Sequence, residues 1–466
     1  MRHNYLGITL FILVSSVCFQ CSPTYNDNIE NVLDNAGNKR ADLEGVLVHY
    51  QLPADSLKRK AAYFLVENFP EDKYQTIDKQ LLIENIELAF QVWKKLWAKQ
   101  LTFDEFKELV LPFDLERDST GTFWRKRFMD EYAFVEDSLI RYPNENPTIA
   151  ACIIVNKKMK KKYRILAELG KTNPRSLYEW EKKRTGDCVG MAYFTNNLMH
   201  SIGIPTAVEF TPQWANQTDK HYWSSVFANK HFFSFVGAES NPRKCKIEIA
   251  YLSFIRKRPN VFRITYAINP LSLASQTDEE IPDIFNSTHF QNISKTTIPT
   301  QDLTLALPDS INDTYLYLSV FSRKTINGIA WGKRDDSKVQ FSSVRPEAVY
   351  ILSTYKHGEF SHTNYPFILQ NDGQKRILKP QINSFESIIC HKKYPVDSTN
   401  MVKIGDKYEL LYWDQFGWKS LGSKVASEKK LTFDKVPKNA LLLLTDLSRG
   451  RKERIFTYEN SKQIFW

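Results

Sequence analysis

Cysteine is scarce in this chain, with six in 466 residues. Two of the six lie close to the N-terminus, which leaves four for the rest of the protein. Four cysteines in so long a chain exclude a disulfide-scaffold protein. A structural zinc site also lacks support, because this part of the sequence contains no Cys-x-x-Cys pair. The four cysteines are Cys152, Cys188, Cys245 and Cys390.

The apolar run near the N-terminus is too short to cross a bilayer. It covers residues 6–17, whereas a spanning helix needs about 20 residues. Arg2 and His3 precede it and a polar stretch follows, which predicts a secretion signal. A cysteine closing such a signal is similar to a bacterial lipoprotein site. Cys21 is the preferred acylated residue and Cys18 the alternative; an ordinary cleaved signal with two incidental cysteines is the other interpretation.

Acidic residues are outnumbered by basic ones, and the net charge is +10. The densest basic run covers residues 157–162 within a predicted helix. A solvated helix face explains this run better than a nucleic-acid site does, and export makes nucleic acid a still poorer partner. We therefore expect no nucleic-acid partner.

Hydrophobic periodicity divides the chain into regions and predicts an α+β protein. After a signal at 1–21 and a tether at 22–40, helical patterns dominate residues 41–170. A helix followed by strands is predicted for a core at 171–270. Short aromatic and β-branched runs with turn residues then predict two antiparallel β-sandwich modules, at 300–385 and 386–466.

The two predicted modules share a weak internal repeat. The segment that starts Phe341-x-x-Val344 matches the one that starts Phe433-x-x-Val436 over twelve positions without a gap. Each copy follows a turn with adjacent Gly and Trp. This favours a duplication, although β modules in general share such patterns.

Cys188 is the residue with the clearest chemical potential. It lies at the predicted start of a helix that runs to about Ile202. A helix N-terminus offers unpaired backbone N–H groups and the positive end of the helix dipole. Both favour a thiolate, which is the reactive form of cysteine.

Thiol acyl transfer also needs a base, an orienting group and oxyanion donors. His221 opens a later strand, and antiparallel strands packed on the Cys188 helix can bring it opposite the thiol. Glu239 follows the next strand and is the candidate to orient the imidazole. The oxyanion donors would be the Cys188 backbone N–H and the side chain of Trp180 or Tyr178. Taken singly, each of these residues is more often structural, so the hypothesis rests on their order.

That order resembles the transglutaminase-like superfamily, which has a papain-like core. The matching elements are a Gly-x-Cys helix start, a Gly-Ile-Pro helix exit, a His-x-Trp strand and an acid after the next strand. Here they are Gly186-Asp187-Cys188, Gly203-Ile204-Pro205, His221-Tyr222-Trp223 and Glu239. The superfamily usually has Asp, slightly nearer the histidine, where this chain has roughly Phe235. The whole layout is similar to a group of Bacteroidetes cell-envelope lipoproteins with C-terminal β modules.

The resemblance implies attack on an amide carbonyl of an extracellular peptide or glycopeptide, with hydrolysis ahead of cross-linking and no metal or organic cofactor. The protein would be an outer-membrane lipoprotein, periplasmic or surface-exposed, held to the membrane by its N-terminal lipid. The alternative is a catalytically inactive surface protein that keeps the fold and binds peptide or glycan. Stacking on sugars would need exposed Trp rings in the β modules.

Overall fold

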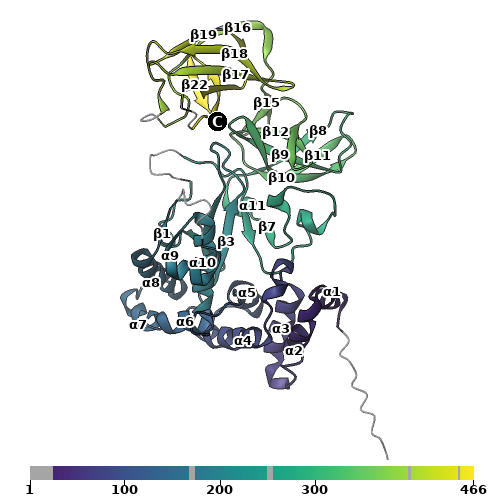
Figure 1. Cartoon of the computed structure of the whole chain (residues 1–466), viewed down its shortest axis with the longest axis vertical. Coiled ribbons are helices and arrows are strands. Elements are labelled where there is room, and N and C mark those ends of the chain that lie inside the picture. Colours follow the sequence, from purple (N-terminus) through teal and green to yellow (C-terminus); the bar gives the residue numbers. More distant parts are fainter. Residues whose placement is uncertain (1–24, 167–173, 249–254, 397–399, 450–451) are drawn as a thin grey trace, which may run out of the picture.

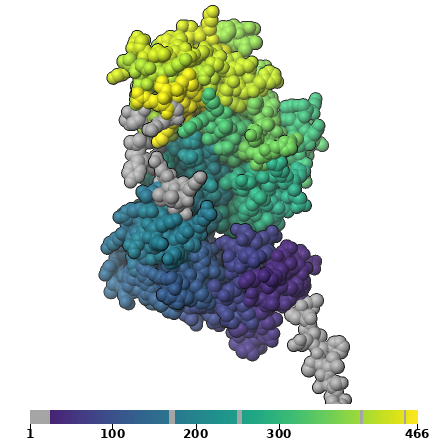
Figure 2. Space-filling view, viewed as in Figure 1, coloured from purple at the N-terminus to yellow at the C-terminus, as the bar shows by residue number. Residues whose placement is uncertain are grey.

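The computed structural model describes residues 25–166, 174–248, 255–396, 400–449 and 452–466. The helical region lies at one end, the core in the middle and the β modules at the other end (Figure 1). Figure 2 shows the N-terminal helices in purple and the last module in yellow at opposite ends of the molecule. The predicted signal, with Cys18 and Cys21, lies outside the described residues.

Local signals position the helices of the N-terminal region. Asn26 and Asp78 accept hydrogen bonds from the backbone at the starts of α1 and α4, and Thr102 with Glu105 forms a capping box at α5. Asn146 caps α8, which has proline in its first turn. The α-helices of this region, with one 3-10 helix that lines the groove described below, are α1 (Asp27–Asn35), α2 (Arg40–Leu47), α3 (Ser56–Glu67), α4 (Lys79–Trp93), α5 (Phe103–Leu109), α6 (Trp124–Glu131), α7 (Val135–Ser138), η4 (Leu139–Arg141) and α8 (Pro147–Lys162).

The helical region and the central region share one hydrophobic core. Buried residues from α1 through α8 lie in the same cluster as Phe194 and Leu198 of α10 (Cys188–Ser201). The indole N–H of Trp97 donates to the carbonyl of Ile202 at 2.8 Å, which satisfies a carbonyl at the end of α10. The helices therefore support the very helix that begins at Cys188.

The central region is a five-stranded sheet packed against α10. Its order is β5-β4-β3-β6-β7, and all neighbouring pairs are antiparallel. Its last strand lies beyond residue 270, the end predicted for the core. The elements are β1 (Arg164–Ile165), α9 (Leu177–Lys183), β2 (Thr185–Gly186), β3 (Thr206–Thr211), β4 (His221–Ala228), β5 (His231–Phe235), β6 (Phe262–Ile264) and β7 (Phe290–Asn292).

The C-terminal half consists of antiparallel strands in two groups. The first group contains β8 (Gln301–Ala306), β9 (Tyr315–Ser322), β10 (Thr325–Asp335), β11 (Lys338–Val344), β12 (Ala348–Lys356), β13 (Glu359–His362), β14 (Phe367–Leu369) and β15 (Lys375–Ile377). The second contains β16 (Gln381–Cys390), β17 (Lys407–Asp414), β18 (Gly417–Val425), β19 (Leu431–Lys438), β20 (Leu442–Asp446), β21 (Ile455–Glu459) and β22 (Lys462–Phe465).

The two groups repeat the same strand pairing. In the first, the order β15-β14-β12-β9-β10 is accompanied by the pair β11–β8. In the second, the order β22-β21-β20-β17-β18 is accompanied by the pair β19–β16. Left-handed backbone recurs at matching places, with φ of 59° at Ser343 and 58° at Lys435, and 60° at Glu347 and 55° at Asn439. These coincidences support the duplication that the sequence repeat predicts.

The modules are joined by an apolar cluster of their own. Phe321 and Ile351 from the first group pack with Trp413 and Leu443 from the second, and all four are 3% exposed or less. Within the described ranges, no helix is long and apolar enough to span a membrane.

Candidate functional site

Cys188 begins α10 directly after a short parallel strand pair. β2 pairs with β1 and delivers the chain to Asp187, whose carboxylate caps the helix by accepting from the Gly190 N–H at 2.9 Å. The Trp180 ring lies beneath this turn, so that a Cβ on Gly186 would come within 2.2 Å of it. Glycine is therefore required here by close packing rather than by backbone angle.

The nearest polar groups to the Cys188 thiol come from its own helix start and from Tyr222 on β4. Burial raises the pKa of the thiol, and the charge of Asp187 raises it further. Backbone N–H groups of Tyr222 and Cys188, together with the charge of Lys220, act to lower the pKa, but the net shift is upward. The thiol form is therefore favoured at neutral pH.

His221 lies in a different environment. Its imidazole is stacked between the rings of Trp214 and Trp223, at centroid distances of 5.4 and 5.9 Å. Burial lowers its pKa to about 4, and the positive charges of Arg256 and Arg258 contribute in the same direction. The imidazole is therefore neutral at physiological pH.

The alternation of side chains along β4 directs His221 and Tyr222 to opposite faces of the sheet. Tyr222 stacks on its cross-strand neighbour Phe210 at 4.9 Å and belongs to the same apolar cluster as Ala192 of α10. Successive residues in a strand point to opposite faces of a sheet. His221 therefore lies on the face away from α10, together with Trp223.

The sheet face that carries His221 and Trp223 is held in place by its own polar network. The Trp223 indole donates to the Glu209 carboxylate at 2.9 Å, and Arg263 pairs with the same carboxylate at 2.6 Å. Trp223 is also part of an apolar cluster with Val261 and Ile293. This packing fixes the sheet face that carries His221 and opposes a strand rotation that would carry the imidazole to the thiol.

Glu239 lies in the turn that joins Val236 to Ser240. Its backbone N–H donates to the Val236 carbonyl at 3.0 Å, and its side chain is exposed. Burial raises its pKa, and the one charge that acts against this is Lys160 of α8. Among the described residues, no hydrogen bond or ion pair connects Glu239 with His221.

Trp180 and Tyr178, the predicted oxyanion donors, are both residues of α9 but lie in different environments. The Trp180 ring is 3% exposed and stacks on Phe194 at 5.3 Å, as part of the core. Tyr178 is 46% exposed on the surface of α9. Among the described residues no hydrogen bond joins either side chain to Cys188, although the Trp180 indole lies beside Gly190 in the first turn of α10.

Tyr222 is the site residue that the sequence analysis missed. The His-x-Trp motif drew the prediction to His221, but the register of β4 turns the intervening tyrosine toward α10. The one signal before the strand is the aspartate itself, since Asp is among the few non-glycine residues that adopt left-handed backbone, and Asp219 has a φ of 82°. Within the described ranges no group of three or more His, Cys, Asp or Glu side chains could hold a metal ion.

Comparisons with known proteins give weak likenesses. No family model matches the chain, and no curated protein matches it. A candidate cysteine protease from Cytophaga hutchinsonii is 12% identical, with a TM-score of 0.19, over 28% of this chain and 43% of that one. Red sea bream transglutaminase is 8% identical, with a TM-score of 0.21, over 70% of this chain and 71% of that one. Neither likeness bears on what this chain does. By its own elements the chain is an α+β protein with an N-terminal helical region, a helix-backed central sheet and strand-rich C-terminal sheets.

Proposed function

We propose that this protein is a non-catalytic binding protein of the cell envelope, which recognises a peptide or glycan and retains a transglutaminase-like core as scaffold. The observation that carries this proposal is the enclosure of the His221 imidazole between the rings of Trp214 and Trp223. A thiol nucleophile needs a base within hydrogen-bond reach. From Tyr222 the thiol receives a backbone N–H, which is a hydrogen-bond donor and cannot serve as that base.

The titration behaviour of the two residues supports the same proposal. A thiolate–imidazolium pair requires a low thiol pKa and a high imidazole pKa. In this chain burial shifts both groups the other way, raising the pKa of Cys188 and lowering that of His221 to about 4. Neither residue is charged at pH 7.

The test is the alkylation rate of each thiol by iodoacetamide at pH ~6, resolved by peptide mass spectrometry. Cys245 is the matched control, because it is partly exposed like Cys188 and burial also raises its pKa. We expect Cys188 to react within about threefold of the Cys245 rate, since unperturbed thiols are protonated at that pH. A Cys188 rate far above that of Cys245, and lost in His221→Ala, would overturn the proposal.

Thiol acyl transfer on amide bonds is the second candidate function. It is favoured by the start of α10, where the N–H groups of Tyr222 and Cys188 face the sulfur. In that case hydrolysis of extracellular peptides or glycopeptides would rank ahead of cross-linking. The rapid, His221-dependent alkylation described above is the result that would favour it.

Membrane attachment through the N-terminal lipid completes the proposal. Its test is metabolic labelling with palmitate in Cys21→Ser and Cys18→Ser variants. We expect only the first variant to lose the label. Loss of the label only in Cys18→Ser would assign the attachment site to Cys18. A wild type without label would contradict attachment through a lipid.

A further inference from the structure

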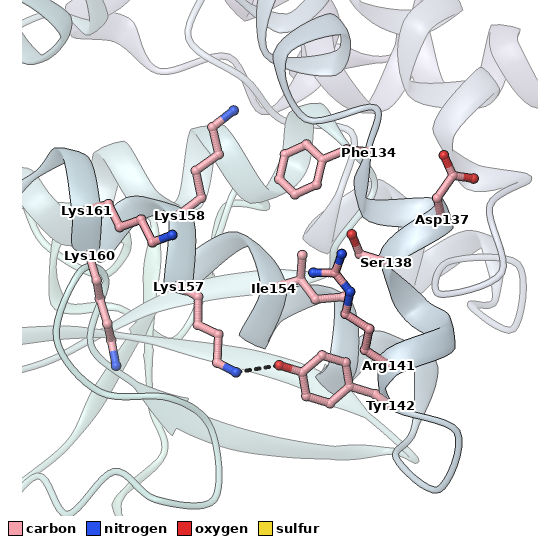
Figure 3. A pocket seen from close by; sticks show the side chains of 10 residues that line it. All are labelled: Phe134, Asp137, Ser138, Arg141, Tyr142, Ile154, Lys157, Lys158, Lys160 and Lys161. Atoms are coloured by element: carbon pink, nitrogen blue, oxygen red, sulfur yellow. Dashed lines mark hydrogen bonds between the residues drawn. The ribbon is translucent and has the colours of Figure 1, made fainter.

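A basic groove lies between two helical segments of the N-terminal region, remote from Cys188 in the sequence. One wall is formed by α7 and η4 and the other by α8, and the volume is about 820 Å³ (Figure 3). Phe134 and Ile154 give it an apolar base. Its other lining residues are Asp137, Ser138, Arg141, Tyr142, Lys157, Lys158, Lys160 and Lys161.

The cations of the groove differ in whether they already pair with a carboxylate of the protein. Lys158 pairs with Glu131 at 3.2 Å and lies over the Tyr132 ring, so its charge is already compensated. Lys157 donates to the Tyr142 hydroxyl at 2.6 Å. Among the described residues, no carboxylate forms an ion pair with Arg141, Lys157 or Lys161. In Figure 3 Arg141 and Lys157 extend between the two walls, Lys161 lies at the end of α8 farther from η4, and Lys160 points away.

We propose that this groove binds the phosphate group of an anionic ligand, carried by a lipid headgroup or by a free phosphorylated sugar. Cationic donors from two opposite walls suit a tetrahedral anion with several oxygens, and lysine binds phosphate as a point charge. Phe134 and Ile154 would contact the apolar or sugar portion. The assignment rests on the proposed binding function and names the chemistry of its ligand.

The test uses the full chain, with Cys18 and Cys21 replaced by serine so that acylation does not contribute. The soluble probe is glycerol 1-phosphate, followed by calorimetry. The membrane probe is vesicles of phosphatidylglycerol in phosphatidylcholine, followed by co-sedimentation against pure phosphatidylcholine. A polyglutamate peptide is the third probe, because an acidic peptide is the competing ligand class.

The groove variant is Arg141→Gln with Lys161→Gln. The control is Arg59→Gln with Lys99→Gln, which removes the same charges from exposed positions outside the groove. Loss of charge-assisted hydrogen bonds predicts about tenfold weaker phosphate binding in the groove variant and less than about twofold in the control. Binding of glycerol 1-phosphate identifies a soluble phosphate ligand, and binding confined to phosphatidylglycerol vesicles identifies a lipid headgroup.

Three outcomes overturn the proposal: equal losses in both variants, no binding of either phosphate probe by wild type, or a groove-dependent loss seen only with polyglutamate. A circular dichroism spectrum establishes that each variant is folded. The alkylation experiment on Cys188 is independent of the groove. The two proposals can therefore fail separately.

Discussion

The guanidinium of Arg454 donates to the carbonyl oxygen of Ala215, which precedes it by 239 residues. The same side chain donates to the carbonyl of Phe321 at 2.6 Å and to that of Trp466. It is fully buried, and burial lowers its pKa to about 9. One cation thus connects the central region, the first module and the end of the chain.

Arg454→Met should destabilise the protein strongly, because it removes a fully buried donor from the carbonyls of Ala215, Phe321 and Trp466. The Phe321 carbonyl keeps the Gln213 amide as a second donor. Buried unsatisfied polar groups cost about 1–3 kcal/mol each before relaxation, so a loss of about 2–4 kcal/mol is expected. Denaturant unfolding measures it. Arg449→Met is the control, since the Arg449 side chain is 55% exposed and pairs with Asp406, and its loss should cost below about 1 kcal/mol.

Tyr222→His should turn Cys188 into a reactive thiol. The substitution places an imidazole on the sheet face that packs against α10. We expect iodoacetamide alkylation of Cys188 at pH ~6 to rise by about tenfold or more, because an adjacent imidazolium stabilises the thiolate. His221→Gln in the same assay should leave the rate unchanged. An unaltered rate in a folded Tyr222→His variant would contradict the assigned register.

His200 should make stability depend on pH below neutrality. Its nitrogens face the carbonyls of Thr206 at 2.9 Å and Pro112 at 2.8 Å. Burial lowers its pKa to about 4, although the hydrogen bonds to these two carbonyls act to raise the pKa. Between about pH 6.5 and 4, His200 binds a proton in the unfolded chain but not in the folded chain.

Stability should therefore be fully present above pH 6.5 and decline as the pH falls toward 4. One pKa unit corresponds to about 1.4 kcal/mol, so His200 alone accounts for about 3 kcal/mol over this range. Unfolding free energies measured at several pH values should show a shallower slope for His200→Gln and an unchanged slope for the exposed His231→Gln. An NMR titration of His200 in wild type provides a check that survives a poorly folded variant.

Gly186→Ala should destabilise the start of α10, because the added Cβ would meet the buried Trp180 ring at 2.2 Å. Gly45→Ala is the contrasting substitution. Its Cβ would meet the flexible Lys79 side chain at 2.7 Å, in the middle of helix α2. Alanine is favoured over glycine in a helix by up to about 1 kcal/mol. Thermal unfolding should thus separate a loss at Gly186 from no change or a gain at Gly45.

The sequence predicted elements better than it predicted relationships between them. The helix at Cys188, its end near Ile202 and the strands from His221 and His231 are all present. These features depend on local caps, turns and periodicity. Which face of β4 meets α10 depends on the register of one strand, and a shift of a single residue reverses it.

The same distinction between local elements and distant contacts applies to the C-terminal modules and to the helical region. The repeat that begins at Phe341 and Phe433 predicted the duplicated strands, because matching left-handed turns accompany matching residues. The boundary at residue 170 between a helical region and a core came from hydrophobic periodicity, and Leu65 and Leu198 on either side of it belong to one apolar cluster. Contacts between residues so far apart leave no periodic signal in the sequence. The sugar-binding alternative requires exposed Trp rings in the β modules. Trp413 does not meet this requirement, because it is 3% exposed and Trp418 packs against it at a centroid distance of 5.1 Å.

The apolar cluster between the two modules has a consequence for how the chain can be divided. A fragment that ends before β16 would present Phe321 and Ile351 to water, and the isolated second group would present Trp413 and Leu443. Such newly exposed surfaces favour self-association. The two modules therefore depend on each other to bury this cluster. A recombinant fragment that contains only one of them would be prone to aggregate.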